Sequence, residues 1–386
     1  MEILLLLLAF PLIWPFLARM IWKTTITWAE MGIQIVAVSA LIVGVWFAGQ
    51  YDATADTEYL NGSVTNKSRV TVSCEHSYDC NCYTTYSTDS KGNTTSSTYC
   101  DTCYDHYEDY DWNVVTSVGN FNVMRVDDQG EDEPRSWTVI KKGQPASLSH
   151  DYTNYIKAVP ESLFNNTSFK PEQYAEMIPD YPHRHDYIKV DRIVPVGVSI
   201  PNKKELNEHL SKRLIEIGPK KQANINIVVA KTGDQTYRYA LEAAWLGGKK
   251  NDVTVVIGAP EYPKIAWVDV MTLGQNAGNA MLAVDIRDSL MALGTFDIKV
   301  VDTVADSVLV HFSRKAMKDF EYLEDSIEPP TWVIVTSVII SILGSLFGTW
   351  FFHNYDVNRG GFVSSRAYSR YNRHSRATSR SRKLRK

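Results

Sequence analysis

The sequence predicts a membrane-anchored α+β protein, and three patterns carry this prediction. Uncharged apolar segments stand near both ends of the chain. All five cysteines lie within one polar stretch that follows the amino-terminal apolar segments. Strand-like and helix-like segments then alternate, as in a sheet with helices on its faces. We therefore expect transmembrane helices at both ends, a small Cys-rich antiparallel β region, and an α/β domain before the last membrane helix.

The last apolar segment, residues 331–352, has the features of a transmembrane helix. Its 22 residues carry no charge. As a helix they would measure about 33 Å, enough to cross the hydrocarbon core of a bilayer. Trp332 and Trp350 stand near its two ends, where membrane helices often carry aromatic residues. We predict one span here, followed by a basic disordered tail over residues 353–386.

Two further apolar segments stand near the amino terminus. Residues 31–49 are 19 uncharged residues and predict a second span. Residues 1–18 are also apolar but contain Pro11 and Pro15, so they could be a span, a cleaved signal peptide or an interfacial segment. A signal peptide is disfavoured, because Glu2 stands where basic residues belong and no A-x-A cleavage site follows.

Charge is distributed unevenly along the chain. Residues 353–386 carry ten Lys or Arg and one acid, whereas residues 50–352 carry 28 basic and 41 acidic side chains, a net charge of −13. Basic segments beside membrane helices stay in the cytoplasm. We therefore expect a cytoplasmic tail and an extracytoplasmic body over residues 50–330. The acidic body disfavours nucleic-acid binding, which needs a positive surface.

The basic tail repeats Arg with Ser and Tyr and has no apolar period. Anionic lipids, a cytoplasmic partner or nucleic acid could each bind such a segment. We favour lipids, because their contact needs no assumption beyond the membrane location. The residues expected to contact lipid are Arg366, Arg370, Arg373, Arg376, Arg380, Arg382 and Lys383.

Small residues recur at four-residue spacing in two of the spans. The seams are Ala40-x3-Gly44-x3-Ala48 and Gly344-x3-Gly348. Small side chains on one helix face let helix backbones approach closely in a membrane. These seams predict either contact between the spans or a homo-oligomer.

The cysteines and two nearby histidines allow two chemistries. The residues are Cys74, Cys80, Cys82, Cys100, Cys103, His76 and His106. Four thiolates, or three with an imidazole, could hold zinc. Disulfides are favoured by an extracytoplasmic location, and an odd number of cysteines leaves one thiol unpaired or paired between chains. The sequence favours disulfides and leaves zinc open. The acidic run at residues 105–111 could bind calcium, but a solvated acidic face is the simpler interpretation.

Short β-branched or alternating segments surround the cysteines. The expected strands are Val70–Ser73, Trp112–Val118, Asn120–Val126 and Arg135–Ile140. The polar insert Thr84–Thr98 is expected to be a solvated hairpin tip or loop. A small antiparallel sheet pinned by the cysteines follows from this pattern.

The strings CEHSYDCNC, YCDTCYDHYEDYDWNV, VGNFNVMRVDDQGEDEPRSWTVI and DYTNYIKAVPESLF resemble a family of membrane-anchored proteins encoded by large tailed bacteriophages. The resemblance covers roughly residues 30–170. It implies a location in the host inner membrane, with a periplasmic ectodomain, and it implies no activity.

Residues 171–200 are expected to be a linker that ends in a strand at Asp191–Ile200, and the period then changes to that of an α/β domain over residues 201–327. Leu206, Leu210, Leu214 and Ile217 form one apolar helix stripe. The next expected helices cover residues 234–245 and Gly278–Leu293. The expected strands are Ile225–Ala230, Asp252–Gly258, Lys264–Leu273 (nearer an edge) and Phe296–Val301.

The strings ELNEHLSKRLIEIG, INIVVA, YRYALEAAWLGGKKNDVTVVIG and VDVMTLG resemble the TPM family of membrane-anchored α/β domains over roughly residues 200–300. Some members of that family bind calcium or act as phosphatases. The resemblance therefore implies a possible acidic metal site, for which the candidates are Asp252, Asp269, Asp285 and Asp288. Their spacing is not diagnostic, and no phosphate-binding loop or catalytic motif accompanies them.

These patterns favour a non-enzymatic, phage-encoded envelope protein whose ectodomain binds an unknown protein partner outside the membrane. One alternative is a TPM-like metal-dependent phosphohydrolase. The other is a metal-responsive or redox-responsive ectodomain. Zinc or calcium could be bound, and the sequence requires neither ion.

Overall fold

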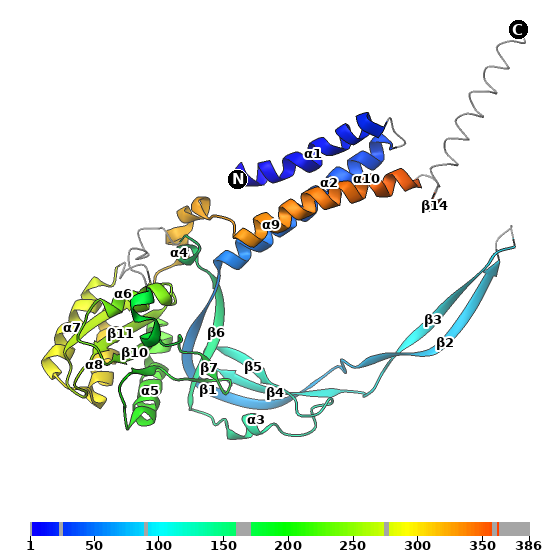
Figure 1. Cartoon of the computed structure of the whole chain (residues 1–386). Helices are drawn as coiled ribbons and strands as arrows, with labels where there is room; N and C mark the ends of the chain where they lie inside the picture. Colours follow the sequence, from blue (N-terminus) through cyan, green and yellow to red (C-terminus); the bar gives the residue numbers. More distant parts are fainter. Residues whose placement is uncertain are drawn as a thin grey trace, which may run out of the picture. The chain divides into compact units, whose positions relative to one another are not determined.

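The computed structural model describes residues 2–22, 26–88, 92–159, 171–273, 278–356 and 361–362. The chain forms two compact units (Figure 1). One unit comprises Met1–Ala55 and Leu323–Lys386, and the other comprises Asp56–Tyr322. The predicted contact residues of the basic tail, Arg366 to Lys383, lie outside the described residues.

The first unit contains three long apolar helices. They are α1 (Glu2–Trp22), α2 (Trp28–Thr54) and a carboxyl-terminal helix made of α9 (Thr331–Ile339), a π-helical turn η3 (Ile340–Gly344) and α10 (Ser345–Asn354). All three are long and apolar enough to cross a membrane. The segment at residues 1–18, which the sequence left open, is therefore part of a helix of spanning length.

Polar side chains connect the three helices inside this unit. The Gln34 amide donates to Ser345 O (2.7 Å) and to Thr349 Oγ1 (3.2 Å). Trp14 Nε1 donates to the same threonine hydroxyl at 3.0 Å, and Ser341 Oγ donates to Leu7 O at 3.2 Å. Such bonds between helices stabilise association in a membrane, where burial of apolar surface contributes little.

The two small-residue seams behave differently. A Cβ added at Gly344 would lie 3.4 Å from Val38, and one at Gly348 would lie 2.8 Å from Gln34, so this seam packs against α2 as predicted for a contact between spans. Ala40, Gly44 and Ala48 are exposed on α2. A homo-oligomer through the seam of Ala40, Gly44 and Ala48 stays a prediction.

The second unit begins with an antiparallel sheet of strand order β5-β4-β1-β6. Its strands are β1 (Ala55–Val72), β4 (Asp109–Thr116), β5 (Gly119–Val123) and β6 (Pro145–Thr153). Val64, Trp112, Val114 and Val123 form its buried side. The predicted antiparallel sheet is present, but its four strands contain no cysteine, and its first strand is far longer than the segment predicted at Val70–Ser73.

Between β1 and β4 the chain forms a separate two-stranded hairpin of β2 (Ser77–Thr88) and β3 (Thr94–Tyr104), visible as a long ribbon in Figure 1. A bulge interrupts its register between Cys80 and Tyr83. The segment Thr84–Thr98 was expected to be a tip or loop, and it is mostly paired strand. Threonines that face each other explain the difference, because their hydroxyls pair across the strands, as between Thr84 and Thr98 (3.1 Å).

A mixed sheet of order β12-β11-β10-β9 forms the rest of the unit. Its strands are β9 (Ile193–Val196), β10 (Asn224–Ala230), β11 (Asp252–Gly258) and β12 (Trp267–Thr272). β9, β10 and β11 are parallel, and β12 is an antiparallel edge strand, as the sequence predicted. The predicted α/β arrangement is therefore present, whereas the TPM-like fold in particular stays a prediction.

Helices cover both faces of this sheet. On one face lie α5 (Lys203–Lys221), α7 (Ala280–Leu293) and α8 (Ile298–His311), which form the main core together with β10 and β11. On the other lie α6 (Tyr237–Ala244) and the 3-10 segment η1 (Pro171–Met177).

The remaining short elements of the described chain are α3 (Arg135–Val139), α4 (Tyr155–Ala158), β7 (Arg184–His185), β8 (Lys189–Val190), η2 (Met317–Ser326), β13 (Tyr355–Asp356) and β14 (Gly361–Phe362).

Two predicted strands are wrong. Phe296–Val301 lies at the start of helix α8, because Asp297 caps the helix by accepting from Lys299 N (2.8 Å). Val300, Val304 and Val308 then reach the core at helical spacing, so packing overrides their β propensity. Arg135–Ile140 forms the short helix α3, which starts after Pro134 with a turn from Trp137 N to Pro134 O (2.9 Å).

Candidate metal centre

Two chain links at the base of the hairpin carry the candidate metal ligands. Cys74 and His76 lie between β1 and β2, and His106 lies between β3 and β4, followed by Asp109 as the first residue of β4. The register of β1 and β4 places Val72 opposite Asp109, so both links start at the same end of the sheet. A hydrogen bond from Asp105 N to His76 O (3.1 Å) joins the links.

The four side chains converge on one point. Their possible ligand atoms all lie within 4.8 Å of one another. Cys74 Sγ is 3.8 Å from His106 Nδ1, which is 3.4 Å from Asp109 Oδ1. His76 Nδ1 is 3.6 Å from Asp109 Oδ2. Zinc bonds of about 2.0–2.3 Å in a tetrahedron separate neighbouring ligand atoms by about 3.3–3.8 Å. Two of the spacings between ligand atoms, from Cys74 Sγ to His106 Nδ1 and from His106 Nδ1 to Asp109 Oδ1, fall within this tetrahedral range.

Two ligand atoms in this cluster are buried without a hydrogen-bond partner. They are His76 Nδ1 and Asp109 Oδ1. The Asp109 side chain is fully buried, and Cys74 is 7% exposed. Buried polar atoms are normally hydrogen-bonded, because an unsatisfied one costs about 1–3 kcal/mol. Unsatisfied atoms that face the same point as a thiol and a second imidazole are the arrangement that a metal ion would satisfy.

The other oxygen of Asp109 is held by neighbouring groups. Arg125 Nη1 donates to Asp109 Oδ2 at 3.0 Å, and Glu75 N donates to it at 3.2 Å. Arg125 is itself fixed by Asp111, to which it donates at 2.8 Å and 3.0 Å. Burial alone would raise the pKa of Asp109, but hydrogen bonds from Glu75 N–H, the Cys74 thiol and Arg125 lower it overall. Asp109 is thus held as a carboxylate with Oδ1 free.

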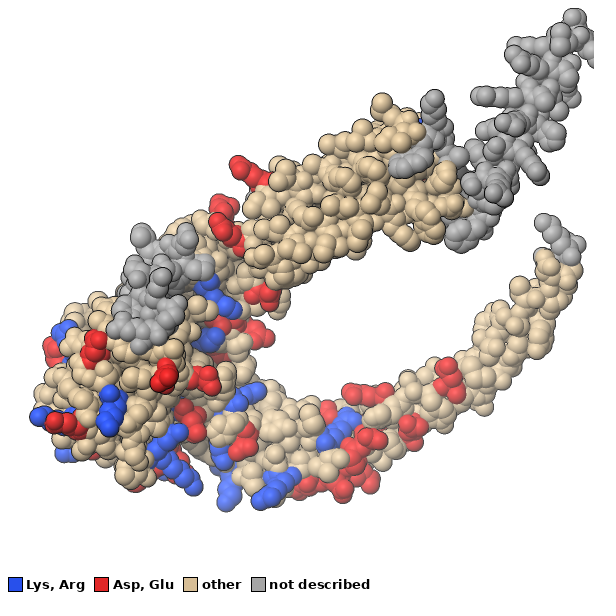
Figure 2. Space-filling view, in the orientation of Figure 1, with Lys and Arg blue, Asp and Glu red and all other residues tan. Residues whose placement is uncertain are grey.

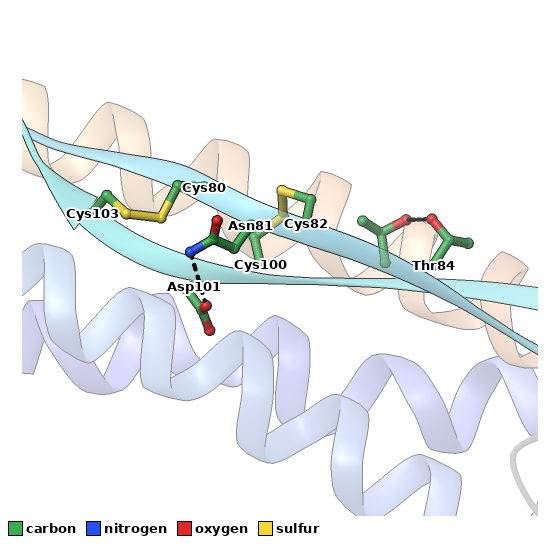
Figure 3. The surroundings of a disulfide bond; sticks show 8 residues. Cys80, Asn81, Cys82, Thr84, Cys100, Asp101 and Cys103 are labelled. Atoms are coloured by element: carbon green, nitrogen blue, oxygen red, sulfur yellow. Dashed lines mark hydrogen bonds between the residues drawn. A yellow bond between two sulfur atoms is a disulfide. The ribbon is translucent and has the colours of Figure 1, made fainter.

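Two disulfides account for the other four cysteines (Figure 3). Cys80 bonds Cys103, and Cys82 bonds Cys100, both across the hairpin. Cys74 is the one free cysteine, and it is buried. The favoured prediction of disulfides is confirmed for four cysteines. The structure also brings the fifth cysteine, Cys74, close to His76 and His106, so a metal site beside the disulfides stays a candidate.

The donor set suits zinc better than calcium. One thiolate, one carboxylate and two neutral imidazoles balance the charge of a divalent ion, and zinc takes these ligands in sets of four. Calcium prefers six to eight oxygen ligands. Among the four ligands, Asp109 was considered only as part of the acidic run at residues 105–111, and the sequence did not join it to the cysteines and histidines. Its signal was the spacing His106-x2-Asp109, which mirrors the short spacing of Cys74-x-His76.

The aspartates proposed for an acidic metal site lie in separate surroundings. Asp252 is buried at the start of β11 and accepts from Tyr181 Oη (2.7 Å) and Asn224 Nδ2 (2.9 Å), and burial raises its pKa. Asp269 lies 3.5 Å from Arg238 Nε. Asp285 faces His311 and Asp288 faces Arg287. Within the described residues, the cluster of Cys74, His76, His106 and Asp109 is the one group of three or more potential ligands that converges.

Comparisons with protein-family models, with curated proteins and with solved structures found no match to this chain. The candidate function therefore depends on the geometry of the site. The phage and TPM resemblances and the phosphohydrolase alternative stay predictions.

Proposed function

We propose that this protein is a membrane-anchored zinc-binding protein of the cell envelope, with its metal in the extracytoplasmic unit. The convergence of four zinc-type ligands, two of them with unsatisfied buried atoms, carries the proposal. Three helices of spanning length support the membrane location. The two disulfides support an oxidising, extracytoplasmic compartment for the hairpin.

Zinc in this site would have a structural or regulatory role. A site with four protein ligands leaves no open position for a substrate or a water molecule, unlike catalytic zinc sites, which use three. The ligands come from both links between the hairpin and the sheet, so the ion would join these links.

The hairpin presents exposed tyrosines, among them Tyr83, Tyr86 and Tyr99, and we assign to it the binding of an envelope partner.

Zinc content of the full chain tests the proposal. We expect about one zinc per chain after purification in detergent and dialysis, measured by elemental analysis. Cys74→Ser and His106→Ala should each remove most of this zinc, because a four-ligand site loses a bond and, for Cys74, a charge. His183→Ala is the matched control, since His183 is exposed outside the cluster. Zinc that stays after substitution of Cys74 would contradict the proposed site.

A further inference from the structure

A groove in the second unit combines an apolar floor with basic side chains. It consists of two adjoining cavities of about 700 Å³ and 420 Å³, which share Gln144, Ile188 and Lys189 as lining residues. Its walls come from the first half of α5, from the segment around β7 and β8, and from α3. We call this the basic groove.

Positive charge is in excess along the basic groove. Its charged lining residues are Arg135, Lys189, Lys203, Lys204 and Lys212 against Asp186, Asp191 and Glu208. The ion pairs within this set are long, at 3.5 Å for Lys189, 3.9 Å for Lys203 and 4.0 Å for Lys204. Arg135 and Lys212 have no carboxylate within 4.0 Å among the described residues. These cations stand out, because residues 50–352 together carry a net charge of −13.

An acidic loop adjoins the basic groove in the chain. The loop is residues 127–133, and its carboxylate Asp127 accepts from the backbone N–H of Gly130 (2.6 Å), Glu131 (3.0 Å) and Asp132 (2.7 Å). These bonds fix the loop in one conformation. Asp128, Glu131 and Asp132 point outward, are exposed, and have no basic group within 4.0 Å in the part of the chain that the structure describes.

We propose that the basic groove binds the acidic loop of a second copy of this chain. Only Pro134 separates Glu133, at the end of the loop, from Arg135, which lines the groove. Figure 2 shows acidic side chains gathered near the base of the β2–β3 hairpin. Because the two features adjoin, a two-fold symmetric pair brings each loop to the groove of the other copy. The contact is then made twice per dimer.

Charge complementarity selects this occupant. Nucleic acid would meet the same cations but would be repelled by the net charge of −13 on the body. The acidic loop supplies a strip of carboxylates to Arg135 and Lys212, neither of which has a carboxylate partner within the described ranges. Both copies share the plane of one membrane, and this raises their effective concentration, so a modest affinity is sufficient. The inference is independent of zinc in the metal centre.

Complementary charge reversal tests the proposal on the full chain in detergent micelles. The groove variant carries Lys204→Glu and Lys212→Glu, and the loop variant carries Glu131→Lys and Asp132→Lys. Analytical ultracentrifugation should show dimers for the unmodified chain that dissociate as salt is raised. The dimer affinity of each variant alone should fall by roughly tenfold or more, because like charges then face each other. An equimolar mixture should regain dimers, because both contacts of the mixed pair again join opposite charges.

Controls separate this contact from others. Lys318→Glu reverses an exposed charge outside the groove and should leave dimerisation unchanged. Thermal unfolding and zinc content of each variant show whether it folds, and restored dimers in the mixture show it directly. A chain that is monomeric at all concentrations would overturn the proposal. It would do so even if a separate peptide of residues 126–134 bound the groove. So would dimers that withstand both reversals but are lost in Gly44→Leu, which would assign the contact to the membrane helices.

Discussion

Asp109 joins the candidate metal centre to the sheet. It is the first residue of β4, and its two oxygens have different tasks: Oδ2 accepts from Arg125 and Glu75, and Oδ1 faces the other ligands. A ligand that is oriented by its own hydrogen bonds needs no rearrangement when the ion arrives. The geometry of the site is thus fixed by residues that do not themselves touch the metal.

Arg125 is the positioning residue in this arrangement. Arg125→Met keeps much of the side-chain length but removes the donors to Asp109 and Asp111. We expect zinc affinity to fall about 10–100-fold, with one site per chain retained, because outer-shell partners of zinc ligands have effects of this size. Competition with a chelator of known affinity measures the change. Arg287→Met, on an exposed part of α7, is the control, and equal affinity in Arg125→Met and wild type would show that Arg125 does not position Asp109.

Asp56 gives the second unit an acid-sensitive contact. Burial opposes its ionisation, but Lys249, Asn154 and Tyr152 bond to the carboxylate and lower its pKa overall. The ordinary pKa of an unfolded aspartate is about 3.9. A folded pKa below this value adds stability at pH above about 4, and the added stability is lost as the pH falls through the folded pKa.

We therefore expect Asp56→Asn to lower the free energy of unfolding at pH 7, and the difference from wild type to shrink below about pH 4. Denaturant unfolding of the full chain at a series of pH values measures this, and Asp288→Asn, at an exposed site on α7, is the control. A difference that is as large at pH 3 as at pH 7 would mean that the contact does not depend on the ionised carboxylate.

Among the elements, the membrane helices pack through small residues at defined places. A Cβ added at Gly49 would overlap the side chain of Val333, which is fully buried and β-branched, whereas one at Gly44 would meet nothing within 4 Å. The two glycines lie on the same helix, so they form a matched pair of test sites.

Gly49→Leu should destabilise the helix bundle by about 1–3 kcal/mol, because an overpacked contact must displace its neighbours. Gly44→Leu should have little effect on the same bundle. Thermal unfolding in detergent distinguishes the two variants. Equal melting temperatures for both would show that α2 does not pack on α9 through Gly49.

The elements that could be predicted are those whose signal is local. The membrane spans follow from uncharged runs, and β10 and β11 follow from short apolar runs between turn signals. Helix α8 could not be recognised from the β-branched run at residues 300–304, because its packing on the sheet decides its conformation. The length of β1 was missed for a similar reason: its polar residues are fixed by pairing with the neighbouring strands β4 and β6 and not by an apolar pattern.

At the scale of the whole molecule, the metal centre depends on contacts between distant residues. Cys74 and His106 are separated by 32 positions, and the register of β1 with β4 brings them together. The sequence could therefore propose the cysteines and histidines and favour disulfides, but it could not show which cysteine stays unpaired or that Asp109 lies beside it. The two disulfides use four of the five cysteines. The remaining thiol, Cys74, lies beside two imidazoles and the Asp109 carboxylate.

Native mass spectrometry of the full chain, with and without chelator, tests the central claim most directly. The expected mass is that of a chain with two disulfides and one zinc ion. The chelator should remove the zinc, and alkylation should then modify a single thiol, Cys74, which zinc protects beforehand. A zinc-free chain in zinc-containing buffer, or a zinc that leaves Cys74 open to alkylation, would contradict the proposed centre.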